Sequence, residues 1–221
     1  MIMDIHSHTY FSMCGRDEPD FTIQAAIDGG IELFGISDHN YGIADRKREY
    51  YDFICSYKEK YKGKIKIICG IELATVNRLW LSDDEDISFF DYCLIEHIDR
   101  PDSVVGKDFV NYAKRCGCAE VGIAHTDLFG FAEKIGMDDC EFFSQLADNN
   151  IFWEMNVNYD SIHGYNEHAY VKNFVQSEYQ QDIIRKCGVK VSVGSDGHRV
   201  EDYKPERVIE MCEFLHQKNI V

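Results

Sequence analysis

Short runs of apolar residues alternate along the chain with longer stretches in which apolar positions recur at helical spacing. Glycine, aspartate, asparagine or serine bounds each short run, so these runs predict strands over residues 2–6, 33–37, 65–71, 91–96, 119–124, 151–156 and 189–194. The stretches between them predict helices over residues 21–28, 46–61, 105–116, 138–148, 168–187 and 205–218. We expect Asp20 to cap the first helix, Gly29 and Gly30 to end it, and residues 77–90 to form a loop with a short turn.

The alternation of strands and helices predicts parallel strands joined by right-handed crossovers, in an open sheet or a closed barrel. Imidazoles and carboxylates follow nearly every predicted strand: His6, His8, Asp38, His39, Glu72, His97, His125, Asp196 and His198. Only a barrel brings all its strand ends round one mouth, where such folds assemble their sites. The sequence therefore favours an α/β barrel with a functional site at the carboxyl ends of its strands.

The composition of the chain limits the kinds of molecule that it can bind. The chain has 221 residues, and its 23 basic against 39 acidic residues give a net charge of −16, which repels nucleic acid and anionic lipid. A small anionic substrate remains compatible with this charge if metal ions reverse the potential locally. There is no run of eighteen apolar residues, no secretory signal and no paired CxxC among the nine cysteines, so we expect a cytoplasmic protein with reduced thiols and no membrane contact.

The residues at the strand ends suit metal binding. His6 and His8 lie two residues apart, so in a straight strand both side chains point to one side and can hold one ion. Glu72 ends a buried strand, where a lone charge is costly, and a bridging position between two ions satisfies both its oxygens. Asp38 either orients a ligand histidine or makes an Asx turn after its strand.

Three further segments also combine histidines with carboxylates that could bind metal. Glu96–Asp99 and Ala124–Asp127 each place a carboxylate two residues after a histidine, which fits either metal ligands or a polar pair under a loop. Ser195–Arg199 combines a carboxylate, an imidazole and a guanidinium suited to phosphate oxygens. The chain has no P-loop, G-x-G-x-x-G, G-x-S-x-G or H-E-x-x-H motif.

Together these motifs resemble the PHP superfamily of polymerase and histidinol phosphatase domains, in its histidinol-phosphatase-like branch. The matching motifs are Asp4-Ile5-His6-Ser7-His8, Ser37-Asp38-His39, Gly70-Ile71-Glu72, His97-Ile98-Asp99, Ala124-His125-Thr126-Asp127 and Ser195-Asp196-Gly197-His198. The resemblance implies one domain over residues 1–221, a distorted (β/α)7 barrel of the TIM type. It also implies two or three divalent ions of zinc, iron or manganese at the mouth.

The resemblance also assigns ligands. It implies one ion held by His6, His8, Glu72 and Asp196, a second held by Glu72, His97 and His125, and a third held by His39 and His198. Cys14 stands where the family usually has a further histidine of the third site, and it is either a thiolate ligand or a small buried residue. Arg16 and Arg199 are candidate phosphate contacts, and we expect these two arginines and Asp38 to assist catalysis.

The resulting hypothesis is a phosphatase that hydrolyses a small phosphomonoester with water activated by metal ions, without a protein nucleophile. Histidinol phosphate is one possible substrate, but residues 157–160 follow the sixth strand where that branch carries a substrate-binding arginine. Asp160, His163 and His168 are candidates for protonating the leaving group. The alternatives are an amidohydrolase-like enzyme that cleaves C–N bonds and a non-catalytic metal-binding regulatory module.

Overall fold

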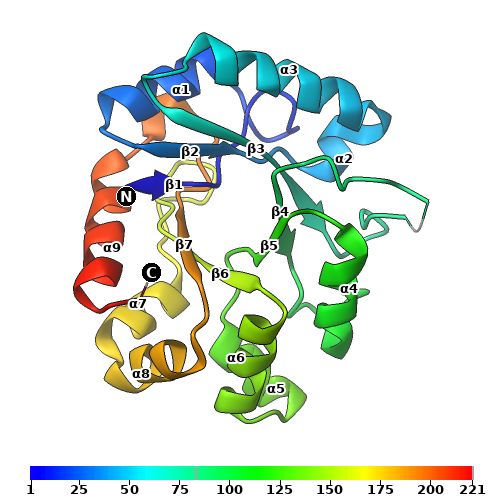
Figure 1. The fold of residues 1–221 in the computed structure, drawn as a ribbon, viewed down its shortest axis with the longest axis vertical. Helices are drawn as coiled ribbons and strands as arrows, with labels where there is room; N and C mark the ends of the chain where they lie inside the picture. The colour runs from blue at the N-terminus through cyan, green and yellow to red at the C-terminus, as the bar shows by residue number, and fades with distance from the viewer. Residues whose placement is uncertain (83, 221) are drawn as a thin grey trace.

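Seven parallel strands form one sheet whose order in space is their order along the chain (Figure 1). The computed structural model describes residues 1–82 and 84–220. The strands are β1 (Met3–Asp4), β2 (Leu33–Ile36), β3 (Lys66–Ala74), β4 (Tyr92–Glu96), β5 (Glu120–Ile123), β6 (Ile151–Asn156) and β7 (Val191–Gly194). The first and last strands meet, because the Ile5 N–H donates to the Val193 carbonyl at 3.0 Å and Ser7 bridges Gly197 in parallel. The predicted α/β barrel is confirmed.

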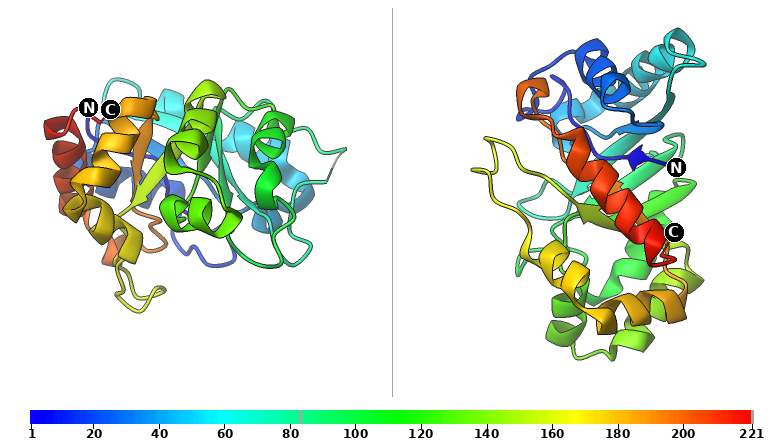
Figure 2. Two further views of the ribbon diagram at one scale, coloured as in Figure 1. Left: turned by 90° about the horizontal axis from the view of Figure 1, so that it is seen from below. Right: turned by 90° about the vertical axis from the view of Figure 1, so that its left-hand side faces the viewer.

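Helices surround the strands on the outside of the barrel (Figures 1 and 2). They are α1 (Pro19–Asp28), α2 (Asn40–Ile43), α3 (Lys47–Lys60), α4 (Phe109–Cys116), α5 (Leu128–Ile135), α6 (Asp139–Asp148), α7 (Ala169–Gln176), α8 (Glu178–Cys187) and α9 (Pro205–Gln217). Short 3₁₀ turns precede α3, α4 and α9. Between β3 and β4 the described residues contain no helix or strand, as predicted for this segment. No helix among the residues that the structure describes is both long and apolar enough to cross a membrane.

Three helix predictions need correction. The stretch 168–187 is two helices, because Ser177 is extended and its side chain accepts the Gln180 N–H that starts α8. Helix α5 was not predicted; Asp127 begins it by accepting the Gly130 N–H. Asp20 does not cap α1, which begins one residue earlier at Pro19.

The barrel interior is filled by two aromatic side chains that lie over glycines. Tyr92 covers Gly70, where an added Cβ would lie 2.3 Å from the ring, and Phe152 covers Gly122, where it would lie 2.0 Å from the ring. The Tyr92 hydroxyl donates to the Ile5 carbonyl at 2.6 Å across the interior. These rings close the amino-terminal part of the barrel, in line with the layered packing of such interiors.

The same alternation that points these rings inward also places three carboxylates at the mouth. Glu72, Glu96 and Glu154 each lie an even number of residues after an inward-facing position of their strand, so all three point into the barrel. Each is less than 4% exposed. The alternation along the strands therefore places three buried glutamates at the carboxyl ends of the strands, above the two aromatic rings in the barrel interior.

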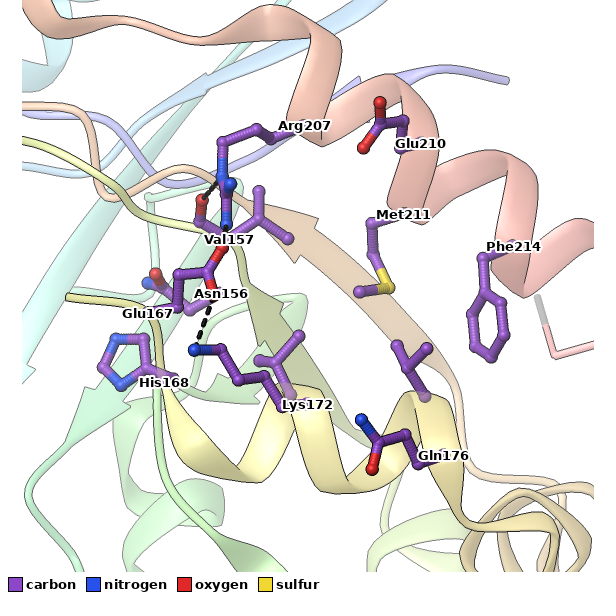
Figure 3. A pocket seen from close by; sticks show the side chains of 12 residues that line it. Asn156, Val157, Glu167, His168, Lys172, Gln176, Arg207, Glu210, Met211 and Phe214 are labelled. Atoms are coloured by element: carbon purple, nitrogen blue, oxygen red, sulfur yellow. Dashed lines mark hydrogen bonds and ion pairs between the residues drawn. The ribbon is translucent and has the colours of Figure 1, made fainter. Parts of the chain in front are cut away.

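Outside the barrel, α7 and α9 enclose a hollow of about 330 Å³ (Figure 3). Glu167 lies at its edge and pairs with Arg207 at 2.5 Å and with Lys172 at 2.6 Å. Arg207 also donates from Nε to the Val157 carbonyl at 3.0 Å. One arginine thus fastens both ends of the loop that joins β6 to α7.

We expect Gly122→Ala to lower the free energy of unfolding by about 1–3 kcal/mol, because its Cβ has no room beside Phe152. Urea denaturation with unchanged m-value measures the loss. Adding Phe152→Leu should recover part of the stability lost in the single glycine variant. A Gly122→Ala protein as stable as the parent would show that this close packing does not exist.

Candidate metal centre

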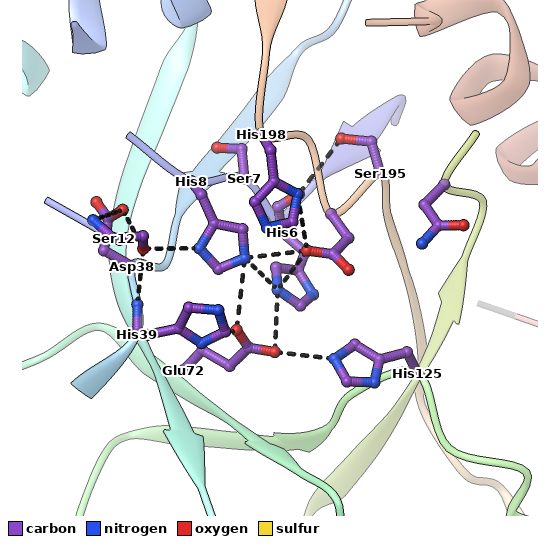
Figure 4. A network of polar contacts seen from close by, with 12 residues as sticks. His6, Ser7, His8, Ser12, Asp38, His39, Glu72, His125, Ser195 and His198 are labelled. Atoms are coloured by element: carbon purple, nitrogen blue, oxygen red, sulfur yellow. Dashed lines mark hydrogen bonds and ion pairs between the residues drawn. The ribbon is translucent and has the colours of Figure 1, made fainter. Parts of the chain in front are cut away.

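Two imidazole nitrogens from the first strand face each other at the mouth of the barrel. His6 Nε2 and His8 Nε2 lie 3.2 Å apart, and both rings are fully buried (Figure 4). His6 Nε2 also lies 3.2 Å from Glu72 Oε1, and His8 Nε2 lies 3.0 Å from Asp196 Oδ1. Four groups from three distant parts of the chain therefore converge on one small volume.

The hydrogen bonds behind the rings fix which nitrogen carries the proton. His6 Nδ1 lies 2.7 Å from a carboxylate oxygen of Glu154, so this nitrogen donates. His8 Nδ1 lies 3.0 Å from Ser12 Oγ, and that hydroxyl donates its own proton to Asp38 Oδ1 at 2.6 Å. The Ser12 oxygen must then accept from His8 Nδ1. In the neutral rings both Nε2 atoms are thereby left with lone pairs directed at each other. Without metal, burial opposes a charge on His6, but the charges of Glu154 and Glu72 outweigh burial and raise the pKa of His6 well above its usual range, so a second proton sits on that ring.

A cluster of lone pairs and carboxylate oxygens without donors is repulsive in a low-dielectric interior. It becomes favourable when a cation, or protons on the imidazoles, occupies the volume between the acceptors. His6, His8 and Asp196 each offer one atom that can bind a metal ion, and these three atoms all lie within 4.8 Å of one another. We call such a group of possible metal ligands a donor set.

Glu72 joins this position to its neighbours. Its Oε1 lies 3.0 Å from His125 Nε2, while its Oε2 lies 2.7 Å from His39 Nδ1. Two further sets of donors result, one of His6, Glu72 and His125 and one of His39, Glu72 and Glu96. The fully buried Glu72 thus belongs to two donor sets at once, which is the position that a bridge between two ions would require.

Cys14 lies beside the same cluster. It forms a set of donors within 4.8 Å with His8, His39 and His198. Burial alone would raise the pKa of the Cys14 thiol, but hydrogen bonds with His198 and His39 outweigh burial and lower its pKa to about 7. The position therefore favours a thiolate, which is the form that binds metal.

His97 is the predicted ligand that the structure does not bring into a donor set. Its Nδ1 lies 3.0 Å from Glu96 Oε2, and its side chain is 35% exposed. The inward position at the end of β4 belongs to Glu96, which follows Tyr92 and Leu94 at even spacing. His97 comes one residue after Glu96, so the alternation of the strand directs it to the other face. Glu96 takes a place in the cluster that the sequence analysis gave to His97.

Glu154 and Ser12 were not identified from the sequence. Glu154 holds His6 by Oε1 and accepts the His125 N–H at its other oxygen at 2.8 Å. The sequence could have identified Glu154 as an inward-facing residue, because it comes two residues after Phe152 in the same strand, β6. Ser12 carries no comparable signal, since it acts through a turn that only the folded loop creates.

The three residues expected to assist catalysis occupy different surroundings. Asp38 does not face the cluster; it is fully buried and accepts bonds from Thr9 and Ser12, so it acts on His8 only through Ser12. Arg16 is exposed and pairs with Glu201 at 3.1 Å. Arg199 is half-buried and donates to Ser161 Oγ at 3.3 Å.

Two ligand positions follow their strands in unusual backbone geometry. His125 has φ of 24° and Asp196 has φ of 50°. Such angles cost of order 1–3 kcal/mol in residues other than glycine and persist only where the surroundings enforce them. The turn at each strand end directs the side chain back over the barrel mouth instead of along the strand.

Charge is concentrated in this cluster. Burial, followed by the charge of Glu72, raises the pKa of Glu96 to about 8. Burial opposes a charge on His125, but its hydrogen bond to Glu72 outweighs burial and raises its pKa to about 9. For His198 the charge of Asp196 outweighs burial and raises the pKa to about 10. Without metal, protons take the place of cations among these carboxylates.

The sequence of this chain matches a known protein family, and its fold matches solved structures. The family model of the PHP domain matches residues 4–213. This chain belongs to the PHP family. A search of curated protein sequences gave no match.

Solved structures share the PHP fold of this chain at low identity. Histidinol phosphate phosphatase HisK from Lactococcus lactis subsp. lactis Il1403, solved with zinc, L-histidinol and phosphate, is 15% identical with a TM-score of 0.64, over 99% of this chain and 94% of that one. A candidate histidinol phosphatase, hisK, from Listeria monocytogenes is 16% identical with a TM-score of 0.60, over 90% and 96%. A chain of archaeal ribonuclease P, solved with mature tRNA, is 13% identical with a TM-score of 0.53, over 97% and 89%. At these identities the likeness establishes the fold.

Removing the hydroxyl behind His8 should weaken metal binding without changing a ligand. We expect Ser12→Ala to reduce metal affinity about 10–100-fold, because His8 loses the partner that fixes its tautomer. Competition with a chromophoric chelator measures this loss. Ser56→Ala, on the exposed side of α3, is the matched control and should bind like the parent. Equal affinities in the two variants would remove Ser12 from the site.

Metal binding should release protons at neutral pH. His125 and His198 have pKa values of about 9 and about 10, so both rings are protonated at pH 7 in the metal-free protein. A metal must displace these protons, so affinity should rise as the pH rises towards 9 and fall below pH 7. Titration calorimetry in two buffers of different ionisation enthalpy measures the release. Heats that do not depend on the buffer would contradict it.

Proposed function

We propose that this PHP protein is a metal-dependent phosphoesterase that hydrolyses a small phosphomonoester. The observation that carries the proposal is the convergence of His6 Nε2 and His8 Nε2, which lie 3.2 Å apart, on the carboxylates of Glu72 and Asp196 at 3.2 and 3.0 Å. Hydrogen bonds to Glu154 and Ser12 hold this arrangement.

The residues present fit divalent cations of the zinc, iron or manganese type. Imidazole and carboxylate donors suit all three metals, and the Cys14 thiolate favours the softer zinc and iron. Two adjacent ions in such a cluster supply Lewis-acid stabilisation and lower the pKa of water towards neutrality. His6, His8, Glu72, His125 and Asp196 would hold two ions, and Glu72 would be shared.

The chain's own groups define the remaining roles. Glu154 and Ser12 keep the ligand rings from rotating, so the site is organised before substrate arrives. Aromatic side chains below the cluster keep bulk water out of the barrel. Outside this cluster, the hydrogen bonds of the described residues pair no serine, threonine or cysteine side chain with a histidine ring, which agrees with direct attack by water.

The segment after β6 bears on the substrate. In this chain it brings Asp160 towards Asp196 and His198, and residues 157–160 contain no arginine. An acidic side chain here would repel the phosphate of histidinol phosphate unless cations lie between them. Because this repulsion acts on any phosphomonoester, the missing arginine alone separates histidinol phosphate from the rest, and it enters the panel to be tested as one small phosphomonoester among others.

Two other functions remain as outcomes of the test. An amidohydrolase-like enzyme would cleave C–N bonds, but the bridging position here is held by Glu72, and no lysine takes part in the donor sets found among the described residues. A non-catalytic regulatory module would bind metal without hydrolysis.

The decisive assay loads the purified protein with zinc, manganese or iron and screens phosphomonoesters before and after chelation. We expect hydrolysis that chelation abolishes and metal restores. Glu72→Gln should lower kcat/KM at least 10³-fold because a bridging ligand is lost, while His216→Gln on α9 should leave it unchanged. Full activity of a metal-free preparation would exclude the mechanism. A metal-loaded protein that cleaves only amides, or nothing, would support one of the other two functions.

A further inference from the structure

The loop of residues 157–168, between β6 and α7, extends over the mouth of the barrel (Figure 2). Arg207 holds its two ends through the Val157 carbonyl and Glu167 (Figure 3). Its middle is held by Ser161, whose backbone N–H and hydroxyl both donate to Asp202 Oδ2. The loop is therefore anchored at three points, and its side chains have defined positions over the metal centre.

Asp160 organises the inward side of this loop. It is 4% exposed, and its Oδ1 accepts the His163 N–H at 2.9 Å and His163 Nδ1 at 2.7 Å. The bond at Nδ1 leaves His163 Nε2 with a lone pair, and this nitrogen lies 3.4 Å from Asp196 Oδ2. The loop thus directs another acceptor at the predicted metal ligand Asp196.

Two buried atoms beside it lack hydrogen-bond partners. Asp160 Oδ2 and His198 Nδ1 make no hydrogen bond of normal geometry to any described residue and meet only each other, as an ion pair, although both side chains are buried. They lie 3.4 Å from each other, and His198 Nδ1 lies 3.7 Å from Asp196 Oδ1. Unpaired buried polar atoms are rare in folded proteins and indicate a missing ion or water.

The spacing distinguishes an ion from a direct contact. Hydrogen bonds between these atoms would measure about 2.7–3.2 Å. Ligand atoms round a tetrahedral ion with bonds of about 2.0–2.1 Å lie about 3.3 Å apart. The 3.4 Å between Asp160 Oδ2 and His198 Nδ1 matches two ligand atoms round a cation better than a hydrogen bond. Asp196 lies at the edge of the same volume, 3.4 Å from His163 Nε2 and 3.7 Å from His198 Nδ1.

We infer that Asp160, His163 and His198 form a further divalent-cation site, with Asp196 at its boundary. The three donor atoms all lie within 4.8 Å of one another. One carboxylate oxygen and two imidazole nitrogens select zinc or a similar transition ion over magnesium or calcium. The inference rests on the proposed function only in sharing His198 and Asp196 with the inner cluster. It adds a metal-binding role for the loop, which already holds the ligand side chains in position.

Counting bound ions tests this site. The full chain is stripped, dialysed against excess zinc and analysed for zinc per chain, with circular dichroism to show that each variant is folded. The double variant Asp160→Asn with His163→Gln should bind one zinc ion fewer than the parent, and each single variant should weaken the last ion at least 10-fold. Ile162→Ala, in the same loop and exposed, is the matched control and should bind like the parent.

Anomalous diffraction from zinc-grown crystals of the parent protein provides a measurement that needs no variant. We expect a peak at bonding distance from Asp160 Oδ2 and from a ring nitrogen of His163 or His198. Inner peaks without this one, or a double variant that retains the parent's zinc content and affinity, would overturn the inference and leave the proposed function intact. No zinc at any position would instead overturn the proposed function together with the inference.

Discussion

The structure depends on hydrogen bonds that hold the outer nitrogens of two buried histidines and direct their inner nitrogens at each other. Glu154 behind His6 and Ser12 behind His8 make the cluster an acceptor of cations. Asp38, one step further out, holds Ser12 by accepting both its N–H and its hydroxyl. A chain of hydrogen bonds thus runs from the buried Asp38 through Ser12 to the predicted ligand His8.

Without metal, the buried carboxylates of this cluster repel one another, and their electrostatic free energy is unfavourable. Glu72, Glu154 and Asp196 are buried near one another, and each would be unstable as an isolated charge. In the metal-free protein, raised pKa values on His125 and His198 compensate by keeping these rings protonated. Cations would replace those protons, so the free energy of metal binding would also stabilise the fold.

The barrel provides the rigid support for this chemistry. Tyr92 and Phe152 fill the interior because Gly70 and Gly122 leave room for their rings. The carboxylates that follow on the same inward faces then lie above rigid aromatic rings, which restrict the movement of their side chains. The β6–α7 loop adds a second layer above them, fastened by Arg207, and it brings Asp160 and His163 to a centre that the strands alone would leave open.

The alternation of apolar runs with amphipathic stretches determined the strands and their parallel direction, because each signal is local and repeats along the chain. Together with the imidazoles and carboxylates after the strands, it favoured a barrel over an open sheet. It also determined that His6, His8, Glu72, His125 and Asp196 would gather, since all of them end parallel strands. The same alternation placed Glu96 and not His97 on the inward face of β4, while tertiary structure alone decided that Glu96 meets His39 and Glu72. Tertiary structure likewise decided the roles of Ser12 and Asp160, which depend on hydrogen bonds between loops far apart in sequence and therefore have no local pattern.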